Sequence, residues 1–351
     1  MDNVNSGANK RCQYELVSSS IISGRYSKVL PTGYDDLQKQ LPLALKSINA
    51  KGKFIYYTFD KGVTLFTTLG LTGGVILLPS LALPLALPSL SPLPSLSLLP
   101  SLSLLPSLSS LSSLSPLPSL SSLPPSLSLG FTFSPKANHI RYTLTFRDTN
   151  STSTDAKKTI YFYDQRNFGT LKCVFTNDEL NLKLKSLGPC WISDNISFNE
   201  FLDIVNSTIK KSKNKDDLFV AQFFMNQKKT AGIGNYVVSE VFYETMLWPF
   251  AKMTDLNEDD WFRVYKAIKN IIGSSYLAQK NYLKSKFGII DDDSNDIGDD
   301  DNDYAYGDNH IFSFKVYSRS VCPKGFKIKR EEGPHSRTIH WVPELQKRHK
   351  I

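Results

Sequence analysis

The stretch Gln227–Pro249, which reads QKKTAGIGNYVVSEVFYETMLWP, decides how the chain is organised. Gly232 and Gly234 flank an isoleucine, Asn235 follows them, and apolar side chains then recur at four-residue spacing as far as the proline. That spacing predicts a helix with one apolar face, which the proline ends. A second apolar run at Leu218–Asn226 predicts a helix before the glycines. The stretch is therefore predicted to fold as helix, glycine turn, helix.

The predicted glycine turn offers a place to bind phosphate. Glycines let the backbone approach a ligand closely, and the N–H groups that open a helix attract an anion. Asn235 could cap the second helix or donate its amide to a phosphate oxygen, and Lys228 and Lys229 lie nearby in the sequence. The spacing alone favours a simpler interpretation, a helical hairpin with a flexible corner, because an isolated glycine motif is weak support for a ligand.

The residues themselves are more specific than their spacing. The string MNQKKTAGIGNYVVSE resembles the helix–two-turn–helix motif of the formamidopyrimidine-DNA glycosylase / endonuclease VIII family, whose members excise oxidised bases and cleave the DNA backbone. The matching positions are Gln227, Gly232, Ile233, Gly234, Asn235 and Glu240. The resemblance implies that Gln227, Gly234 and Asn235 bind DNA.

Composition and charge are consistent with a polyanionic partner. The chain has 351 residues and a formal net charge of +8, although Asp291–Asp303 alone contains eight aspartates. Removing that acidic run leaves a more basic remainder, which suits nucleic acid. The four cysteines form no CxxC pair, so neither a zinc site nor a disulfide framework is indicated, and an intracellular, reduced protein is expected.

Two segments could be mistaken for targeting or membrane signals. Residues 1–13 are polar and show no signal peptide, and we expect them to be disordered. Residues 62–135 carry no charge, but prolines interrupt them repeatedly, so we expect no transmembrane helix and no membrane partner. Within them, residues 79–129 consist almost only of Leu, Ser, Pro and Ala. This low-complexity insertion is expected to have no role in chemistry.

The order of predicted elements indicates an α+β fold. We expect an N-terminal antiparallel β-sandwich, a helical helix–two-turn–helix domain and a C-terminal β-hairpin. Strands are predicted at Tyr14–Ile22, Ala50–Phe59, Val63–Thr68, Ile140–Arg147, Lys158–Tyr163 and Thr170–Phe175, and helices at Tyr34–Leu41, Asn199–Lys210, Leu218–Asn226, Tyr236–Leu247 and Glu258–Gln279. The predicted domains are a tail over 1–13, a β domain over 14–190, a helical domain over 191–288, an acidic linker over 289–309 and a hairpin over 310–351. The last is strand-like over His310–Trp341 with a turn near Glu332–Pro334.

The catalytic machinery implied by the resemblance is present only in part. In the family, an N-terminal proline attacks C1′ of the damaged nucleoside and the next glutamate acts as acid. This chain begins Met1-Asp2-Asn3-Val4, so we expect either a missing or altered start or, alternatively, loss of the usual mechanism. Lys53 in AKGKFIYYTF resembles the strand lysine that donates a proton in β-elimination, with Lys51 as its rival by register. Without the resemblance, a strand lysine would simply be solvated.

Three further segments resemble loops that contact DNA in the family. Leu71, in Leu69–Gly73, stands where the family inserts an apolar wedge into the gap left by an extruded base. Arg166 and Phe168, in the predicted turn after Tyr163, match an arginine and an aromatic residue that contact the opposite strand. His139 precedes a strand as a DNA-contacting histidine does. Ordinary hairpin turns are the alternative for both loops.

The tail resembles a zinc finger that lacks its metal ligands. VYSRS at Val316–Ser320 and SRTIHW at Ser336–Trp341 match its two ends, but Cys322 alone remains of four ligands. We therefore expect a zincless finger with no metal and no cofactor. We expect it to be held by packing of Val316, Phe326, Ile328, Ile339 and Trp341. Arg337 matches the finger arginine that grips phosphate and assists δ-elimination.

The resemblance, taken together with these features, implies a base-excision-repair DNA glycosylase with apurinic/apyrimidinic lyase activity. The expected partner is double-stranded or single-stranded DNA with oxidised bases or abasic sites, bound by a monomer. The alternative is a catalytically impaired DNA-binding relative that keeps the DNA contacts but lacks the nucleophile.

Overall fold

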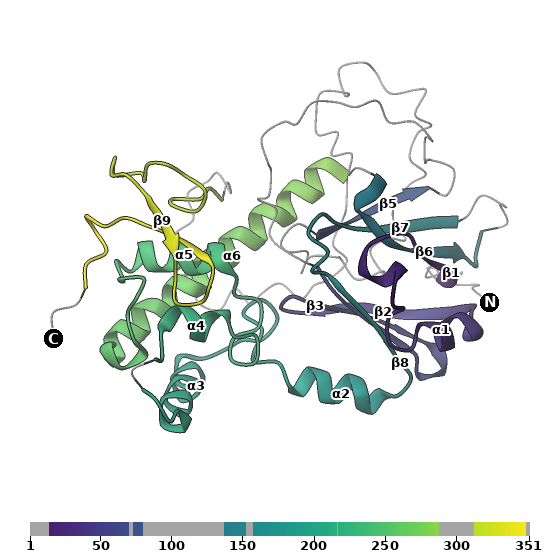
Figure 1. Cartoon of the computed structure of the whole chain (residues 1–351), viewed down its shortest axis with the longest axis horizontal. Coiled ribbons are helices and arrows are strands. Elements are labelled where there is room, and N and C mark those ends of the chain that lie inside the picture. Colours follow the sequence, from purple (N-terminus) through teal and green to yellow (C-terminus); the bar gives the residue numbers. More distant parts are fainter. Residues whose placement is uncertain are drawn as a thin grey trace, which may run out of the picture. The chain divides into compact units, whose positions relative to one another are not determined.

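The computed structural model describes residues 14–69, 73–79, 137–151, 157–215, 217–287 and 312–348 (Figure 1). Leu71, the tail 1–13, the acidic linker 289–309 and nearly all of the insertion 79–129 lie outside the described residues. The chain divides into two compact units, the first comprising Met1–Asn181 with Phe287–Ser294 and the second comprising Leu182–Lys286 with Asn295–Ile351. We call them the β unit and the helical unit. Among the described residues, no helix is long and apolar enough to cross a membrane.

The β unit is built on one antiparallel sheet of eight described strands in the order β5-β7-β6-β1-β2-β3-β4-β8. The strands are β1 (Tyr14–Ile21), β2 (Leu43–Lys51), β3 (Phe54–Phe59), β4 (Thr64–Thr68), β5 (Gly73–Pro79), β6 (Ile140–Asp148), β7 (Lys157–Asp164) and β8 (Thr170–Val174). Helix α1 (Tyr34–Gln40) follows β1, and α2 (Asn177–Lys185) follows β8. Short 3-10 turns lie at η1 (Gly24–Ser27), η2 (Asp60–Gly62) and η6 (Ala137–His139).

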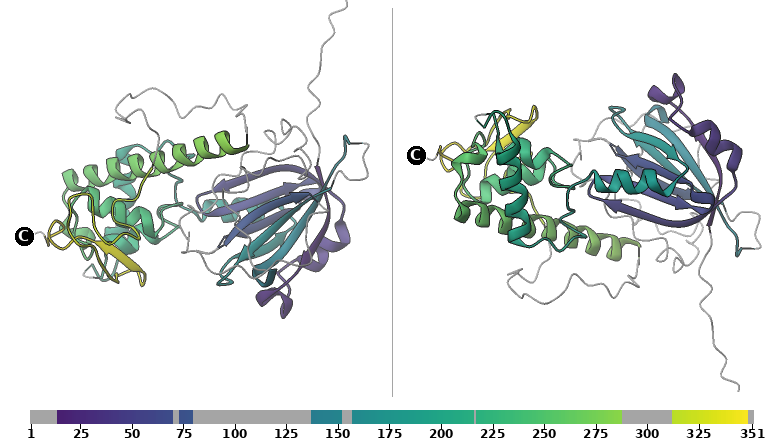
Figure 2. Two further views of the ribbon diagram at one scale, coloured as in Figure 1. Left: turned by 90° about the horizontal axis from the view of Figure 1, so that it is seen from above. Right: turned by 90° about the horizontal axis from the view of Figure 1, so that it is seen from below.

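The sheet consists of two halves with a short join between them. β1 and β2 share only two paired positions, Glu15↔Ala44 and Leu16↔Leu43, whereas the other strand pairs run over longer registers. Figure 2 shows the strands from two further sides. Buried side chains of both halves form a single core, in which the Tyr142 and Phe162 rings stack at 4.2 Å. Alternation of buried and exposed positions along β1 is the pattern of a strand with one face on a core.

The sequence reading of this unit needs two corrections. The segment Ala50–Phe59 is not one strand: β2 ends at Lys51, a turn follows at Gly52 and Lys53, and β3 begins at Phe54. Gly52 has a φ of +59°, a conformation that glycine adopts without steric cost and that reverses the chain. Helix α2 was not predicted, because it buries none of its side chains and so has no apolar face to detect.

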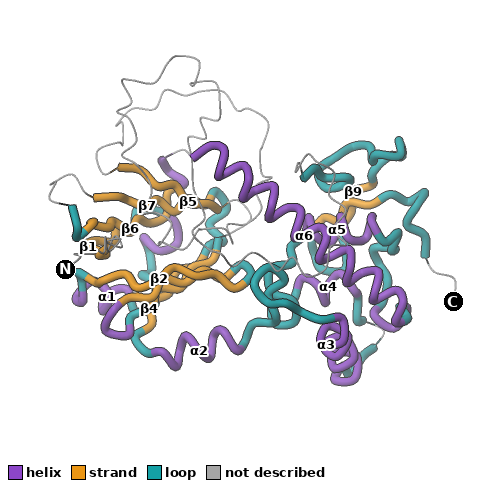
Figure 3. Tube along the Cα trace, turned by 180° about the vertical axis from the view of Figure 1, so that it is seen from behind, coloured by secondary structure: helices purple, strands orange, loops and turns teal. Residues whose placement is uncertain are grey.

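The helical unit contains four α-helices among its described residues (Figure 3). These are α3 (Phe198–Lys211), α4 (Val220–Met225), α5 (Asn235–Glu244) and α6 (Glu258–Phe287), with a 3-10 turn at η7 (Met253–Asp255). Ser197 and Glu200 form a capping box at the start of α3. Aromatic rings fill the core, with Phe201 against Trp191 at 5.4 Å and against Trp261 at 5.9 Å. The predicted helix, glycine turn, helix over Leu218–Leu247 is confirmed as α4, a turn and α5.

The C-terminal segment forms a hairpin, but a shorter one than predicted. β9 (Lys329–Glu332) pairs with β10 (Thr338–Trp341), and the turn between them begins at Gly333, as expected. The described residues before β9 form loops and one isolated bridge, Val321↔Lys327, in place of the strand expected from His310 onward. Phe326 was expected to pack in the hairpin but is 38% exposed, whereas Ile339 and Trp341 join the helical core.

Candidate nucleic-acid interface

The strand register of the β unit gathers several loops at one end of the sheet. Phe54 begins β3 and pairs with Thr68 at the end of β4, which in turn pairs with Thr170 at the start of β8. In the other half, Gly73 at the start of β5 pairs with Asp164 at the end of β7. The β4–β5 and β7–β8 connections join the halves at this end. We call residues 52–53, 138–141 and 164–170, with the ends of the β4–β5 connection, the loop end.

Four of the predicted site residues lie at the loop end. Lys53 directly precedes Phe54, His139 closes η6 just before β6, and Arg166 and Phe168 belong to the β7–β8 loop. Arg166 is exposed, and Phe168 exposes 57% of its surface. Leu71 belongs to the β4–β5 connection and lies outside the described residues. Residues predicted from separate motifs are thus brought together by the fold.

Lys53 occupies a different local structure from the one predicted. It is a half-buried turn residue between β2 and β3, not a strand residue, while Lys51 is the last residue of β2 and pairs with Phe54. The flanking rings of Phe54, Tyr56 and Phe66 pack on one another, with 5.0 Å between the Phe54 and Phe66 centroids. Lys53 therefore lies at the end of the hairpin formed by β2 and β3, not within a strand.

The β7–β8 loop is ordered by a buried carboxylate. Asp164 is 4% exposed, and its two oxygens accept the N–H groups of Arg166 at 3.2 Å and Gly169 at 2.6 Å. Asn167 between them has a φ of +59°, in the left-handed region that asparagine tolerates better than most residues. The loop is therefore held in one turn conformation. Arg141, which no sequence motif singled out, also donates hydrogen bonds to this loop.

In the helical unit, the glycine turn is closed by its own glutamine. Gln227 donates its amide Nε2 to the carbonyl of Ile233 at 2.9 Å, and its Oε1 accepts the N–H of Gly232 at 2.9 Å. Gly232 has a φ of +98°, which explains why glycine stands there. Gly234 is the N-cap of α5 and no side chain caps the helix. Gln227, predicted to bind DNA, is thus seen to fix the shape of the turn.

Asn235 joins the glycine turn to the C-terminal hairpin. Its Nδ2 donates to the carbonyl of Thr338 at 2.7 Å, so its Oδ1 faces Nε2 of His335, also at 2.7 Å. Because that oxygen can only accept, His335 donates through Nε2. Sequence reasoning expected this amide to cap α5 or to bind phosphate and missed its contact with the hairpin, since nothing local in the sequence signals a partner about one hundred residues away.

This contact sets Arg337 beside the start of α5. Arg337 is exposed on the turn between β9 and β10, next to Thr338, whose carbonyl Asn235 binds. Gln222 of α4 donates to the carbonyl of Pro334 at 2.7 Å and holds the other side of the turn. Burial, and then the nearby positive charge of Arg337, lowers the pKa of His335 to about 4, so this histidine is neutral at pH 7. Two predicted site residues, Asn235 and Arg337, are thereby brought together.

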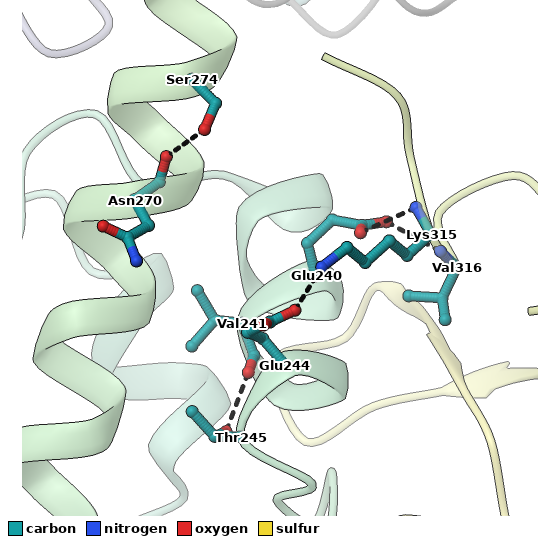
Figure 4. Close-up of polar contacts among 8 residues, drawn as sticks. All are labelled: Glu240, Val241, Glu244, Thr245, Asn270, Ser274, Lys315 and Val316. Carbon is teal, nitrogen blue, oxygen red and sulfur yellow. Dashed lines mark hydrogen bonds and ion pairs between the residues drawn. The ribbon is translucent and has the colours of Figure 1, made fainter. Parts of the chain in front are cut away.

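Glu240 anchors the segment that leads into the hairpin (Figure 4). Its carboxylate is 3% exposed and accepts the backbone N–H groups of Lys315 at 2.9 Å, Val316 at 3.0 Å and Tyr317 at 2.8 Å. One turn later, exposed Glu244 receives Nζ of Lys315 at 2.5 Å. Successive N–H groups converging on one carboxylate form a strong, charge-assisted contact. The glutamate of the matching motif therefore docks the hairpin on α5.

The hairpin residues do not fit a zinc site. Within the described residues, no group of three or more His, Cys, Asp or Glu side chains could hold a metal ion. Cys322 is 4% exposed and packs with Val316, Val342 and Tyr243 in a small core. Burial opposes ionisation of its thiol, but hydrogen bonds from the Phe326 N–H, the Tyr243 hydroxyl and neighbouring backbone outweigh burial and lower the pKa.

The chemistry of the candidate site residues in each unit indicates which ligand they can bind. The β unit presents a lysine, an arginine and an exposed ring at one end of its sheet. The helical unit presents the N-terminus of α5 and an exposed arginine on an ordered turn. Helix N-termini, arginine and lysine bind phosphate, and an exposed ring can stack on a base. Both sets suit nucleic acid.

Comparison with known proteins finds relatives of this chain among DNA glycosylases. No family model matches the chain. A formamidopyrimidine-DNA glycosylase of Thermus thermophilus is 29% identical over 133 residues, covering 36% of this chain and 46% of that protein. A formamidopyrimidine-DNA glycosylase of Carboxydothermus hydrogenoformans is 26% identical over 54% of this chain and 60% of its own length. An endonuclease 8-like protein of Acanthamoeba polyphaga mimivirus is 25% identical over 36% and 39%. The chain thus matches less than two thirds of the length of each of these relatives.

The fold matches solved structures over nearly the whole chain. A Lactococcus lactis formamidopyrimidine-DNA glycosylase with abasic-site DNA superposes with a TM-score of 0.58 at 16% identity, covering 95% of this chain and 92% of that one. A complex of the same enzyme with FAPY-dG DNA gives a TM-score of 0.59 at 17% identity over 97% and 95%. The mixed α/β fold with its large antiparallel sheet is therefore the fold of these enzymes. By sequence similarity and by fold, the chain resembles the formamidopyrimidine-DNA glycosylase / endonuclease VIII family.

Proposed function

We propose that this chain is a DNA glycosylase of base-excision repair that removes oxidised bases and cleaves the resulting abasic site. The observation that carries the proposal is the hydrogen bond of 2.7 Å between Asn235 and the carbonyl of Thr338. It joins the start of α5 to the turn that carries Arg337, and we propose that the helix N-terminus and this exposed guanidinium bind one ligand. Adjacent backbone phosphates of DNA match that pair of groups.

The finer architecture is part of the proposal. We interpret the two sheet halves with their common core as a β-sandwich, α4 to α5 as a helix–two-turn–helix motif, and the C-terminal segment as a zincless finger. Relatives with this fold have been solved with abasic-site DNA and with FAPY-dG DNA. The substrate proposed here is correspondingly DNA with an oxidised base or an abasic site, bound by a monomer without metal or cofactor.

Each predicted residue then has a role. Gln227 and Gly234 shape the turn, Asn235 and Arg337 bind phosphate, and Arg166 and Phe168 contact the strand opposite the lesion with support from His139. Leu71 fills the gap left by an extruded base, which offsets part of the cost of unstacking. Lys53 donates a proton during β-elimination once an amine has formed a Schiff base at C1′, and Arg337 assists δ-elimination.

Borohydride trapping on a duplex with one abasic site tests this function. A Schiff base between protein and C1′ is reduced to a stable covalent complex, and we expect one with the parent chain. Lys53→Leu should slow strand cleavage about 100-fold, the lower range for removal of a general acid. Lys51→Leu, two residues away at the end of β2, is the matched control and should stay within about twofold.

The same experiment identifies the alternative. If the chain binds the abasic duplex more tightly than an intact duplex but forms no trapped complex and releases no oxidised base, it is a catalytically impaired DNA-binding relative. Equal affinity for both duplexes, with no trapping, would contradict the proposal altogether.

A further inference from the structure

Arg141 connects three separate segments at the loop end of the β unit. It is the second residue of β6 and stands two positions after His139. Its Nε donates to the carbonyl of Asp164 at 2.7 Å, and its Nη2 to the carbonyl of Gln165 at 3.3 Å. Its Nη1 donates to the Ser23 hydroxyl at 2.9 Å and to the carbonyl of Asn138 at 3.2 Å. One guanidinium thus binds the end of β7, the residue before His139 and the chain just after β1.

The surroundings of Arg141 leave it little freedom. Its own carbonyl accepts the N–H groups of Ile22 at 2.8 Å and Ser23 at 3.2 Å. A Cβ added to Gly24 would lie 2.9 Å from Cδ of Arg141 and 2.7 Å from the side-chain oxygen of Asn167 in the β7–β8 loop. The arginine stem and the loop therefore pack against a glycine that has no room for a side chain.

We propose that Arg141 is a positioning residue that fixes the β7–β8 loop relative to His139, so that His139, Arg166 and Phe168 meet lesion DNA as one preformed set. The proposal rests on the proposed function and adds a residue to it. Arg166 and Phe168 are exposed on a short loop, and ordering such side chains only on binding would reduce affinity. A guanidinium has five N–H donors in fixed directions, which allows one side chain to bind several loops.

The variant Arg141→Lys distinguishes the positioning role of Arg141 from the effect of its positive charge. Arg141→Lys keeps the positive charge and most of the stem but has one rotating ammonium in place of the planar donors. We expect its affinity for an abasic-site duplex to fall about tenfold, as for the loss of one or two hydrogen bonds. Affinity for an intact duplex of the same sequence should change less than about twofold at matched salt, because non-specific binding follows net charge.

Arg147→Lys is the matched control. Arg147 lies on the same strand near its far end, is exposed, and pairs with Glu15 at 2.7 Å. The same exchange there should leave both affinities unchanged. Equal losses for Arg141→Lys and Arg147→Lys, or an Arg141→Lys affinity for the abasic duplex like that of the parent, would overturn the inference.

A double-mutant cycle shows whether Arg141 acts through the loop. Phe168→Ala should weaken abasic-duplex binding in the parent, but in the Arg141→Lys background its further effect should be within about twofold, because residues acting as one unit are not additive. Fully additive losses would overturn the inference. Should Arg141→Lys fail to unfold cooperatively, Ser23→Ala removes one of its acceptors and should give about a threefold, equally lesion-specific loss.

The outcomes also separate this inference from the proposed function. A parent that distinguishes abasic from intact DNA while Arg141→Lys distinguishes them equally well overturns the role of Arg141 alone. A parent that binds both duplexes with the same affinity overturns the proposed function, and the role of Arg141 with it.

Discussion

Hydrogen bonds to backbone atoms stabilise both the loop end of the β unit and the contact between α5 and the C-terminal hairpin. These hydrogen bonds fix short loops in the first region and attach a whole segment in the second. At the loop end, Arg141 and Asp164 fix short exposed loops on a sheet whose core is complete without them. In the helical unit, Asn235 and Glu240 dock a whole segment that has little core of its own. Losing a link at the loop end should therefore change binding, whereas losing one on α5 should change stability.

The small hairpin core explains this difference. Val316, Cys322 and Val342 pack with Tyr243 of α5, and Ile328 and Leu345 are only partly buried against them. Gln346 adds two buried hydrogen bonds, accepting the Val342 N–H at 2.7 Å and donating to the Leu247 carbonyl at 2.9 Å. Apolar contacts of this size stabilise a segment weakly, so polar links carry more of its attachment.

The largest effect is expected for Glu240→Gln. Oε1 accepts the N–H groups of Val316 and Tyr317, and Oε2 accepts that of Lys315, so whichever oxygen the amide NH2 replaces, at least one backbone donor loses its acceptor. We expect the free energy of unfolding of the helical unit to fall by about 3 kcal/mol. Urea unfolding monitored by tryptophan fluorescence measures this change.

Glu244→Gln is the control, because its partner Lys315 is also a partner of Glu240. The pair between Glu244 and Nζ of Lys315 is about half exposed on both sides, and exposed ion pairs contribute little. We expect a change of less than about 1 kcal/mol. Equal losses for the two glutamates would show that the buried carboxylate does not dock the hairpin.

Asn235→Ala and Arg337→Ala sharpen the comparison within one surface. Asn235→Ala leaves the Thr338 carbonyl and the His335 ring without partners, so it should lower stability by about 2 kcal/mol and also weaken DNA binding. Arg337→Ala removes an exposed side chain and should leave stability unchanged. Its affinity for abasic DNA should fall, and the slope of log affinity against log salt should decrease by about one. Melting curves and salt titrations of both variants measure these effects. A lower stability of Arg337→Ala than of Asn235→Ala would contradict the roles proposed for the two residues.

The sequence predicted the structure best where a residue meets a conformational requirement of the backbone next to it. The glycine turn was predicted because Gly232 meets a backbone need that only a few residues satisfy, and the helix after it shows its apolar period. The turn of Asp164–Gly169 was predicted for a similar reason, since asparagine and glycine permit its conformation. Helix α2 has no buried face and so left no periodic signal, and the turn at Gly52 and Lys53 was missed because Ala50–Phe59 was interpreted as a single strand.

Contacts across large sequence separations were not predictable from one sequence. Asn235 and His335 are one hundred residues apart, and Arg141 binds Ser23 across 118 residues. Both pairings depend on how separate elements pack, which periodicity does not describe. The resemblance supplied residue types for the site, but the structure supplied the partners of Asn235 and revealed Arg141.

The free energy of unfolding should depend on pH through two histidines of the C-terminal hairpin, His335 and His340. Burial, followed by the charge of Arg337, lowers the pKa of His335 to about 4, and burial followed by the charge of Arg330 does the same for His340. In each ring, Nδ1 is buried with no hydrogen-bond partner among the described residues. The unfolded chain binds protons near pH 6.5, so stability is complete above that pH and is lost as pH falls toward 4.

The size of that loss should be modest. After discounting the pKa shifts for solvent screening, we expect about 1 kcal/mol from each histidine. Carboxylates titrate in the same range, so the useful quantity is the difference between the parent and a variant with His335→Gln and His340→Gln. Unfolding at pH 7 and pH 4.5 should show a smaller decline in the variant. Identical declines would mean that the two rings ionise as freely in the folded protein as in the unfolded chain.

The smallest effect is expected for metal removal, which tests what holds the hairpin. A structural zinc ion needs four ligands and supplies much of the folding free energy of a finger. Here Cys322 has its hydrogen bonds from protein groups, and Trp341 is buried in the helical core. Glu240, Asn235 and Gln346 provide the attachment instead. We therefore expect purified protein to contain well below one equivalent of zinc and its melting temperature to be unchanged by a chelator. Stoichiometric zinc whose removal lowers that temperature would show that metal, and not these polar links, docks the hairpin.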